Sequence, residues 1–335
     1  MAERHLFEWQ QSLSIALVAG AVGFVTGLNL PGAFNQSITV SKTSRVQHSS
    51  LDSSTSHVKA LVAQQSEVYK IVLAKLSLEA KLRRLNAPIP VQFQGKTIRG
   101  VQLDDPDKVS VQETQAKRST SSAIAQPKVN AIASRYPIAL TFDDGPWQTS
   151  TSQVLDILNK NKVKATFFMV GRQVQKYPQL VKQVVSEGHA IGNHTWNHQY
   201  HLFNGSAAAR EIEDTSTLIY KTTGIKTSLF RPPAGILTNG LANYAQAKKY
   251  AVVMWSVDSR DWRYYGSTAQ GLVESVLKDA KPGGIVLLHD GGGDRSKTIQ
   301  ALPSLITQLR QRGYKFVTVP ELLESGDKQS KANKG

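Results

Sequence analysis

An apolar run ends in two adjacent carboxylates in the segment ALTFDDGPW, residues 139–147. Asp143 and Asp144 come at the end of a predicted strand, which Gly145 and Pro146 stop. Two acids side by side at a buried strand end repel each other unless cations compensate them. A divalent metal ion would neutralise one carboxylate, and a nearby arginine would stabilise the other.

Two histidines four residues apart supply further metal ligands. His194 and His198 lie in the segment GNHTWNH, directly after another predicted strand. If this segment turns as a helix, the imidazoles face the same way, with Cβ atoms about 5–6 Å apart. One aspartate and two histidines leave coordination positions open, which is typical of a catalytic metal site. This ligand set favours zinc, with cobalt, nickel and manganese as the neighbouring ions left open.

Further side chains suited to acid–base chemistry follow the ends of later predicted strands. Arg231 lies in FRPPAG, whose two prolines indicate a fixed backbone that aims the guanidinium inward. The segment SVDSRDW offers Asp258, Asp261 and Trp262, and VLLHD contains His289. Since chemistry in parallel α/β folds lies at the carboxyl ends of the strands, we expect these groups in one region.

Alternating strand and helix patterns between residues 137 and 324 must position these groups. Strands are expected at residues 138–142, 165–170, 190–193, 229–231, 252–256, 285–289 and 316–319. Amphipathic helices are expected at residues 152–161, 178–187, 207–222, 239–249, 268–280 and 298–312. About seven β/α units predict the α/β class with a parallel sheet. Because no Gly-rich phosphate turn follows the first strand, we expect a distorted (β/α) barrel rather than an open doubly wound sheet.

Five segments in this order, TFDDGP, HTWNH, RPPAG, DSRDW and LLHD, resemble the motifs of the polysaccharide deacetylase family. This family is the NodB-homology domain of the family-four carbohydrate esterases, and the resemblance covers about residues 137–323. It implies a distorted (β/α) barrel that removes N- or O-acetyl groups from sugar polymers with a bound divalent metal, commonly zinc.

The resemblance also implies which residues bind the metal and move protons. The metal ligands would be Asp144, His194 and His198. Asp143 would be the general base that takes a proton from metal-bound water, and His289 would be the general acid that protonates the departing amine. These roles agree with the chemistry of amide hydrolysis, which needs an activated nucleophile and a protonated leaving group.

The remaining matched residues would support the base, the acid and the substrate. The resemblance implies that Arg231 holds the base and that Asp261 orients the acid. Trp262 and Leu287 would line the slot around the sugar and the acetyl methyl. Ala234 stands in RPPAG where relatives usually have an aromatic residue. Its backbone N–H, the oxyanion donor of the family, is retained, but an aromatic wall for flanking sugars is lost.

Other polar residues near these motifs have structural interpretations. His201 is a rival metal ligand, but the adjacent Leu202 and Phe203 suggest that it packs instead. His189 lies at the start of a predicted strand, far from the active end, and is interpreted as structural. Asp258 is interpreted as a turn cap, and GGGD at residues 291–294 as a flexible loop without the lysine and spacing of a P-loop.

Composition restricts the chemistry and the partners. The 335 residues include no cysteine, which excludes disulfides, thiolate nucleophiles and Cys-ligated zinc. The formal net charge is +15, whereas residues 137–324 contain 21 Lys and Arg against 15 Asp and Glu. Most of the excess positive charge therefore lies in the flanking segments. Basic flanks favour an anionic surface such as membrane or cell wall, and we expect no nucleic-acid partner.

Residues 1–34 indicate a cytoplasmic tail and a membrane segment. Residues 13–30 are almost wholly apolar and close to the ~18–20 residues that span a bilayer. We expect an uncleaved signal-anchor that holds the catalytic domain outside the cytoplasm. Secretion after signal cleavage is the alternative. Basic residues flank the segment on both sides and leave its orientation open.

Residues 35–136 are expected to join this segment to the catalytic domain at residues 137–324. Residues 35–56 are rich in Ser and Thr and predict a flexible linker, and residues 57–85 predict a stalk helix. That helix either lies on its neighbours, which we prefer, or associates weakly with a second copy. The sequence also predicts a hairpin at residues 91–103, a loop at 110–134 and a disordered tail at 325–335.

Together these features predict a metal-dependent hydrolase that removes N-acetyl groups from N-acetylglucosamine residues of a cell-envelope polysaccharide. Peptidoglycan is the expected substrate, with chitin-like oligomers next. An O-acetyl esterase acting on xylan or another acetylated glycan would use the same residues and is the alternative. A non-catalytic wall-binding protein is a remoter alternative, because the set of base, acid and ligands is complete.

Overall fold

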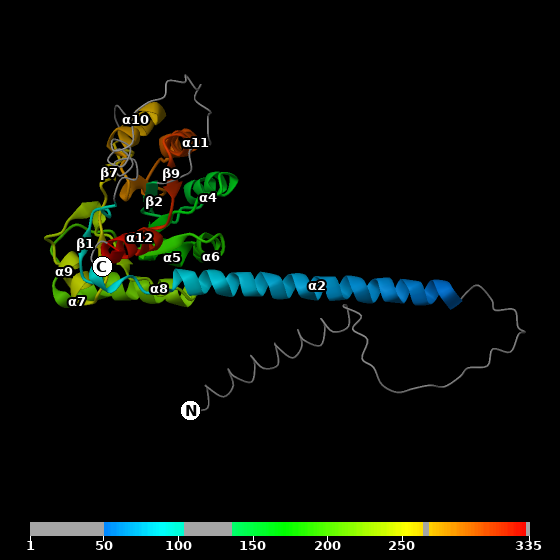
Figure 1. Cartoon of the computed structure of the whole chain (residues 1–335). Helices are drawn as coiled ribbons and strands as arrows, with labels where there is room; N and C mark the ends of the chain where they lie inside the picture. The colour runs from blue at the N-terminus through cyan, green and yellow to red at the C-terminus, as the bar shows by residue number, and fades with distance from the viewer. Residues whose placement is uncertain (1–49, 104–135, 264–267, 333–335) are drawn as a thin grey trace, which may run out of the picture. The chain divides into compact units, whose positions relative to one another are not determined.

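A computed structural model describes residues 50–103, 136–263 and 268–332 (Figure 1). The chain divides into two compact units, Met1–Gln65 and Ser66–Gly335. The predicted membrane segment at residues 13–30 and the predicted loop at 110–134 lie outside the described residues, so both stay predictions. None of the helices found in the described ranges combines the length and apolar character that crossing a bilayer requires.

Within the described residues, nine parallel strands form one curled sheet, which confirms the predicted α/β class. In spatial order the strands are β1 (Thr97–Ile98), β6 (Ala251–Val253), β5 (Leu229–Phe230), β4 (Ala190–Asn193), β3 (Thr166–Met169), β2 (Tyr136–Asp143), β8 (Gly284–His289) and β7 (Val257–Asp258), with β9 (Tyr314–Phe316) beside the start of β2. Residues 251–258 pair with β5 at their start and with β8 at their end. The sheet therefore curls back as a half-barrel.

Helices cover the outer side of this sheet. They are α4 (Ser150–Lys160), α5 (Gly171–Lys176), α6 (Pro178–Ser186), α7 (Gly205–Ala209), α8 (Thr215–Thr223), α9 (Leu241–Ala247), α10 (Ala269–Asp279) and α11 (Ser296–Gln311), preceded by α2 (Ser50–Leu85). The last helix, α12 (Val319–Ala332), packs instead against the inner face, where Leu322 and Leu323 share a core cluster with Ala139. Helices α10, α11, α4 and α6 follow one another along one side of the sheet (Figure 1). Their apolar faces share one core with the strands, as their amphipathic patterns require.

The side chains of β2 alternate between two environments, as expected for a strand. Ile138, Leu140 and Phe142 point into the core beneath the helices, where Phe142 stacks on Phe167 with ring centroids 5.2 Å apart. Thr141 and Asp143 have the opposite parity and therefore face the inside of the curl. This alternation determines which of the two adjacent carboxylates enters the interior.

The predicted hairpin at residues 91–103 is wrong. A short 3₁₀ helix at Val91–Phe93 precedes β1, and β1 pairs in parallel with β6. The backbone N–H groups of Val252 and Met254 donate to the carbonyls of Lys96 and Ile98. Pairing with the edge of β6 therefore stabilises this segment as a strand of the sheet. An isolated two-stranded hairpin would be only marginally stable in water.

Two predicted flexible segments are helical where the structure describes them. α2 begins at Ser50, inside the predicted linker, and it includes the predicted stalk helix. α12 continues through Ala332, so the predicted disordered tail is wrong for residues 325–332. The cause is burial, because Leu322, Leu323 and Gly326 pack into the molecule. Packing of these residues against the core stabilises the helical conformation of the tail.

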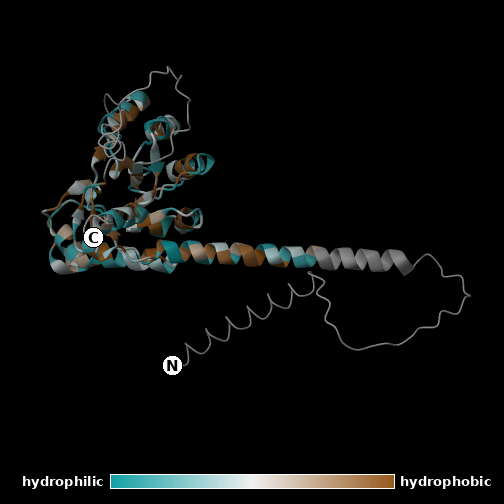
Figure 2. Cartoon of the chain, viewed as in Figure 1, coloured by the Kyte–Doolittle hydropathy of each residue, from teal (hydrophilic) through white to brown (hydrophobic). Residues whose placement is uncertain are grey.

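The C-terminal part of α2 packs on the catalytic domain. Leu82 and Leu85 contact the main core, and the Lys81 ammonium donates to the Ser186 carbonyl at 2.9 Å. This packing agrees with the preferred interpretation, in which the stalk helix lies on its neighbours. Farther up the helix, Val68 and Ile71 are 55% and 65% exposed. Figure 2 shows a hydrophobic stretch in the middle of α2. Weak self-association through residues 57–85 stays a prediction.

The packing of α12 predicts that Gly326→Ala destabilises the protein. A Cβ at this position would overlap Cγ1 of Val101. Overpacking of this kind costs about 1–3 kcal/mol, although alanine is the better helix former. Urea unfolding of both proteins measures the difference. Gly205→Ala is the matched control, because a Cβ there meets no atom within 4 Å. Equal stability of wild type and Gly326→Ala would contradict the docking of α12.

Candidate active site

Arg231, directly after β5, binds the first of the two adjacent carboxylates. Its Nη1 donates to Asp143 Oδ1 at 2.7 Å and to Thr141 Oγ1 at 2.8 Å. Its Nε donates to the Val253 carbonyl at 2.8 Å. Arg231 is fully buried, and its guanidinium lies 4.1 Å from the centroid of the Phe168 ring. A buried guanidinium with these partners fixes the Asp143 carboxylate in position.

The second carboxylate faces two imidazoles. Asp144 Oδ1 lies 3.0 Å from His198 Nε2 and 3.4 Å from His194 Nε2. The ligand atoms of these three residues all lie within 4.8 Å of one another, as metal ligands must. The structure therefore brings the three predicted metal ligands together.

The loop after β4 achieves this arrangement without the helical turn that the spacing of the histidines suggested. Residues 194–198 form no helix. Thr195 and His198 instead have positive φ angles of 67° and 58°, and Asp144 has a φ of 74°. Such left-handed backbone is uncommon for residues other than glycine and gathers at functional sites. The helical turn that the sequence left open is absent, but the two rings do lie together, with centroids 4.9 Å apart.

Glu211 holds this loop and was not identified from the sequence. It lies in a π-helical segment, Arg210–Asp214, where one continuous helix was expected. Its Oε2 accepts hydrogen bonds from the backbone N–H groups of Trp196 and Asn197, both at 2.8 Å. A buried glutamate in an ordinary helical pattern gives no sequence signal for such a role. The π-bulge is a common feature near functional sites.

Two observations show that the site fits a divalent metal ion. Asp144 Oδ1 is buried and has no hydrogen-bond partner. His194 Nδ1 donates to the Arg231 carbonyl at 2.7 Å, so a neutral ring presents the lone pair of Nε2 towards Asp144. A carboxylate oxygen and a ring nitrogen that face each other as acceptors need a cation between them. The carbonyl bond also fixes the ring orientation, as in other metal sites.

The same contacts affect the ionisation of the carboxylate. Burial by itself would raise the pKa of Asp144. The adjacent imidazoles of His194 and His198 outweigh this effect and hold the pKa of Asp144 well below its usual range. Asp144 is therefore anionic at neutral pH, as a metal ligand must be.

A second carboxylate–histidine pair lies beside the metal site. His289 Nδ1 donates to Asp261 Oδ1 at 2.7 Å, and the His289 backbone N–H donates to Asp261 Oδ2 at 2.8 Å. Thr298, on α11, also donates to Asp261 Oδ2 at 2.8 Å. Burial lowers the pKa of His289, but the bond to Asp261 and the nearby carboxylates outweigh it and raise the pKa to about 9. His289 is thus a protonated acid at neutral pH.

One cavity of about 1050 Å³ is lined by Asp143, Asp144, His194, His198 and His289, whereas Arg231 and Asp261 lie behind its wall. Ala234 and Leu287 are part of its lining, as the resemblance implied, and Ala234 has a left-handed φ of 50°. Trp262 also lines the cavity and is 46% exposed, with its Nε1 donating to Asp258 Oδ1 at 3.3 Å. Asp258 also accepts from the Arg260 backbone N–H at 2.8 Å, so it caps a turn as expected and in addition orients Trp262.

The rival histidines have other roles. His201 Nε2 bonds Gln199 at 2.9 Å, and its ring stacks on Phe203 with centroids 4.1 Å apart. His189 is fully buried and accepts a hydrogen bond from the Ala165 backbone N–H at 3.1 Å. Both interpretations from the sequence, packing for His201 and structure for His189, are confirmed.

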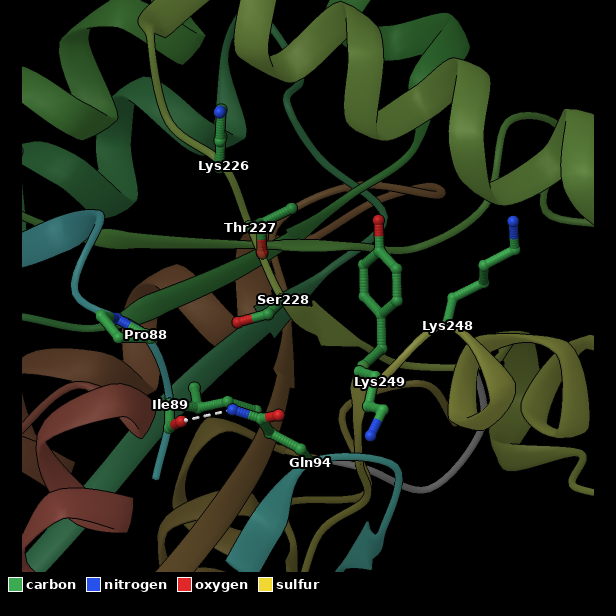
Figure 3. Close-up of a pocket in the computed structure, with 9 residues that line it drawn as sticks. Pro88, Ile89, Gln94, Lys226, Thr227, Ser228, Lys248 and Lys249 are labelled. Atoms are coloured by element: carbon green, nitrogen blue, oxygen red, sulfur yellow. Dashed lines mark hydrogen bonds between the residues drawn. The ribbon is translucent and has the colours of Figure 1, made fainter. Parts of the chain in front are cut away.

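A second pocket lies at the amino ends of β5 and β6, whereas the active-site residues follow carboxyl ends (Figure 3). Its volume is about 320 Å³. Lys226, Lys248 and Lys249 line it, but in Figure 3 their ammonium groups do not converge on one point. Lys248 is already paired with Glu213 at 2.8 Å. This arrangement does not form a convergent anion site.

Comparisons with known proteins agree with the geometry. The sequence profile of a family described as "Polysaccharide deacetylase" matches residues 132–253. The peptidoglycan-N-acetylglucosamine deacetylase of Bacillus cereus is 48% identical over 189 residues, which are 56% of this chain and 87% of that protein.

Two solved structures are similar in fold. One is a peptidoglycan N-acetylglucosamine deacetylase in complex with 4-naphthalen-1-yl-N-oxidanyl-benzamide, with a TM-score of 0.53 and 36% identity. The match covers 56% of this chain and 87% of that one. The other is a family 4 acetyl xylan esterase from Clostridium thermocellum in complex with a cobalt ion, with a TM-score of 0.52 and 35% identity. Here 56% of this chain and 90% of the other are covered.

The geometry predicts that the two adjacent aspartates differ in metal binding. Asp144→Asn removes an anionic ligand and should weaken zinc affinity by at least about 100-fold. Asp143→Asn should change it by less than about threefold, because Asp143 is bound by Arg231. Competition with a chromophoric chelator measures both affinities, and thermal unfolding confirms that each variant is folded. Equal losses in the two variants would contradict the assignment.

The contacts of His289 predict its titration in the metal-free protein. NMR of the imidazole should report a pKa of about 9, and Asp261→Asn should lower it, because the hydrogen bond and charge of Asp261 raise it. The folded pKa exceeds the unfolded value of about 6.5. The pair therefore contributes its full stability below pH ~6.5 and loses it as the pH rises through about 9. An unchanged pKa in Asp261→Asn would contradict the coupling.

Proposed function

The chain belongs to the polysaccharide deacetylase family, and we propose that it removes N-acetyl groups from N-acetylglucosamine residues of peptidoglycan. The observation that carries the proposal is the convergence of three elements in one cavity. They are a metal-ligand triad, a carboxylate held by arginine and a histidine held by aspartate. Hydrolysis of an amide needs all three functions, because the nucleophile must be activated and the amine must be protonated before it leaves.

A divalent ion bound by Asp144, His194 and His198 would supply Lewis-acid polarisation of the acetyl carbonyl and a water of lowered pKa. Asp143 lies next to this triad, with one oxygen bound to Arg231 and the other 3.9 Å from His194 Nε2. In the proposed reaction Asp143 accepts the proton of the attacking water. Arg231 holds the carboxylate in the orientation that this transfer requires.

His289 completes the proposed reaction on the leaving group. Its Nδ1 is occupied by Asp261, so Nε2 is the atom that can donate a proton to the amine. The raised pKa keeps this proton in place at neutral pH. Trp262 and Leu287 would contact the sugar and the acetyl methyl, and the backbone N–H of Ala234 would stabilise the oxyanion.

Several observations support peptidoglycan as the substrate. The Bacillus cereus relative that is 48% identical is named a peptidoglycan-N-acetylglucosamine deacetylase. The excess positive charge lies outside residues 137–324 and favours an anionic cell envelope. We propose that the apolar residues 13–30 anchor the protein in the membrane with the catalytic domain outside the cytoplasm. Zinc is the proposed metal, because two imidazoles and one carboxylate suit it.

An O-acetyl esterase is the second candidate function. The cobalt-containing acetyl xylan esterase, which is 35% identical, favours it. An alkoxide leaves more easily than an amine, so an esterase depends less on its general acid. The contribution of His289 therefore separates the two functions.

The proposed function predicts acetate release from peptidoglycan by the zinc-loaded protein. His289→Ala should reduce kcat by about 100-fold or more on the amide substrate, but by less than about tenfold on acetylated xylan. Wild-type activity on the amide should fall as the pH rises through the pKa of His289, where the acid loses its proton. Enzymatic assay of acetate measures both. A wild-type protein that releases acetate from xylan but from no N-acetylated polymer would exclude the deacetylase proposal.

A further inference from the structure

One wall of the active-site cavity carries two cations that the proposed reaction does not use. Arg172 and Lys176 on α5 both line the cavity and are exposed. They lie four residues apart, on the same side of the helix. Within the described residues neither forms an ion pair with a carboxylate, and the Lys176 ammonium lies 5.1 Å from the centroid of the Tyr177 ring. Both are therefore available to a ligand.

Backbone contacts hold this wall against the metal-binding loop. The N–H of Gly171 donates to the Thr195 carbonyl at 2.9 Å, and the N–H of Arg172 donates to the Trp196 carbonyl at 3.1 Å. The approach is so close that a Cβ on Gly171 would lie 2.6 Å from the Trp196 ring. Because Thr195 and Trp196 lie between the two histidine ligands, α5 has a defined position relative to the reaction centre.

The lining of the cavity is chemically divided. α5 contributes Arg172, Lys176 and the amides Gln173 and Gln175, and no acid. Trp255, Trp262 and Leu287 elsewhere in the lining offer apolar surface suited to a sugar ring and a methyl group. N-acetylglucosamine itself is neutral, so the cations of α5 have no partner on the acetylated sugar. They match a negative charge on a neighbouring unit of the polymer.

We propose that Arg172 and Lys176 form a carboxylate subsite for the unit next to the deacetylated sugar. This inference rests on the proposed function, because peptidoglycan alternates N-acetylglucosamine with muramic acid, which bears a lactyl group and a stem peptide. Arg172 can bind a carboxylate through two N–H groups, and Lys176 adds a point charge. The subsite distinguishes an anionic polymer from neutral chitin or xylan.

The test compares wild type with the double variant Arg172→Ala/Lys176→Ala on three forms of one polymer. These are intact peptidoglycan, peptidoglycan with its carboxyl groups converted to methylamides, and strands whose peptides an amidase has removed. Wild type should show a KM about fivefold lower on the intact than on the methylamidated polymer, and added salt should reduce the difference. The double variant should show no preference. Amidase treatment frees the lactyl carboxylate and removes the carboxyl groups of the peptide. If the double substitution raises the KM for these strands about fivefold, the lactyl carboxylate also binds this subsite; if that KM is unchanged, the carboxylates of the stem peptide are the ligand.

A matched control and a clear contrary result make the test decisive. Lys182→Ala removes a lysine from the neighbouring helix α6 that does not line the cavity, and it should keep the full wild-type preference. A double variant that keeps this preference, or a wild type that has none while it turns over all three polymers, overturns the subsite alone. If wild type releases acetate from none of them, the proposed function itself fails.

Discussion

The structure depends on the separate compensation of two adjacent buried carboxylates. The alternation of β2 turns Asp143 into the interior, where Arg231 neutralises it at 2.7 Å. The positive φ of Asp144 directs the next carboxylate to His194 and His198. Without these partners, the two adjacent carboxylates would repel each other. Each carboxylate thus has its own electrostatic environment and can have its own chemical role.

The two environments are linked through the backbone of the arginine. The side chain of Arg231 binds Asp143, while its carbonyl accepts the Nδ1 proton of His194. The orientations of the proposed base and of a proposed metal ligand therefore depend on the same residue. The proposed acid, His289, is oriented separately by Asp261, which also accepts a hydrogen bond from Thr298. The proposed proton acceptor and the proposed proton donor are therefore held by different residues, Arg231 and Asp261.

Much of the site could be predicted because the reactive residues follow strand ends in a repeating β/α pattern. Parallel strands align their carboxyl ends, so the order of the motifs already indicated that Asp143, Arg231 and His289 would converge. The supporting residues could not be predicted in this way. Glu211 and Thr298 lie within helices, where their polar side chains look like ordinary surface positions. The six-residue helix α5 was also missed, because it is too short to show helical periodicity.

The sequence by itself determined the α/β class, the chemistry of the reactive side chains and their order, because strand periodicity and residue type are local properties. Only the tertiary structure decided how His194 and His198 are brought together, since left-handed backbone and the Glu211 bonds replace the helical turn. It also decided that β1 joins β6 and that α12 stays helical through Ala332. These outcomes depend on an unpaired strand edge and an uncovered core, and both are formed by residues distant in the chain.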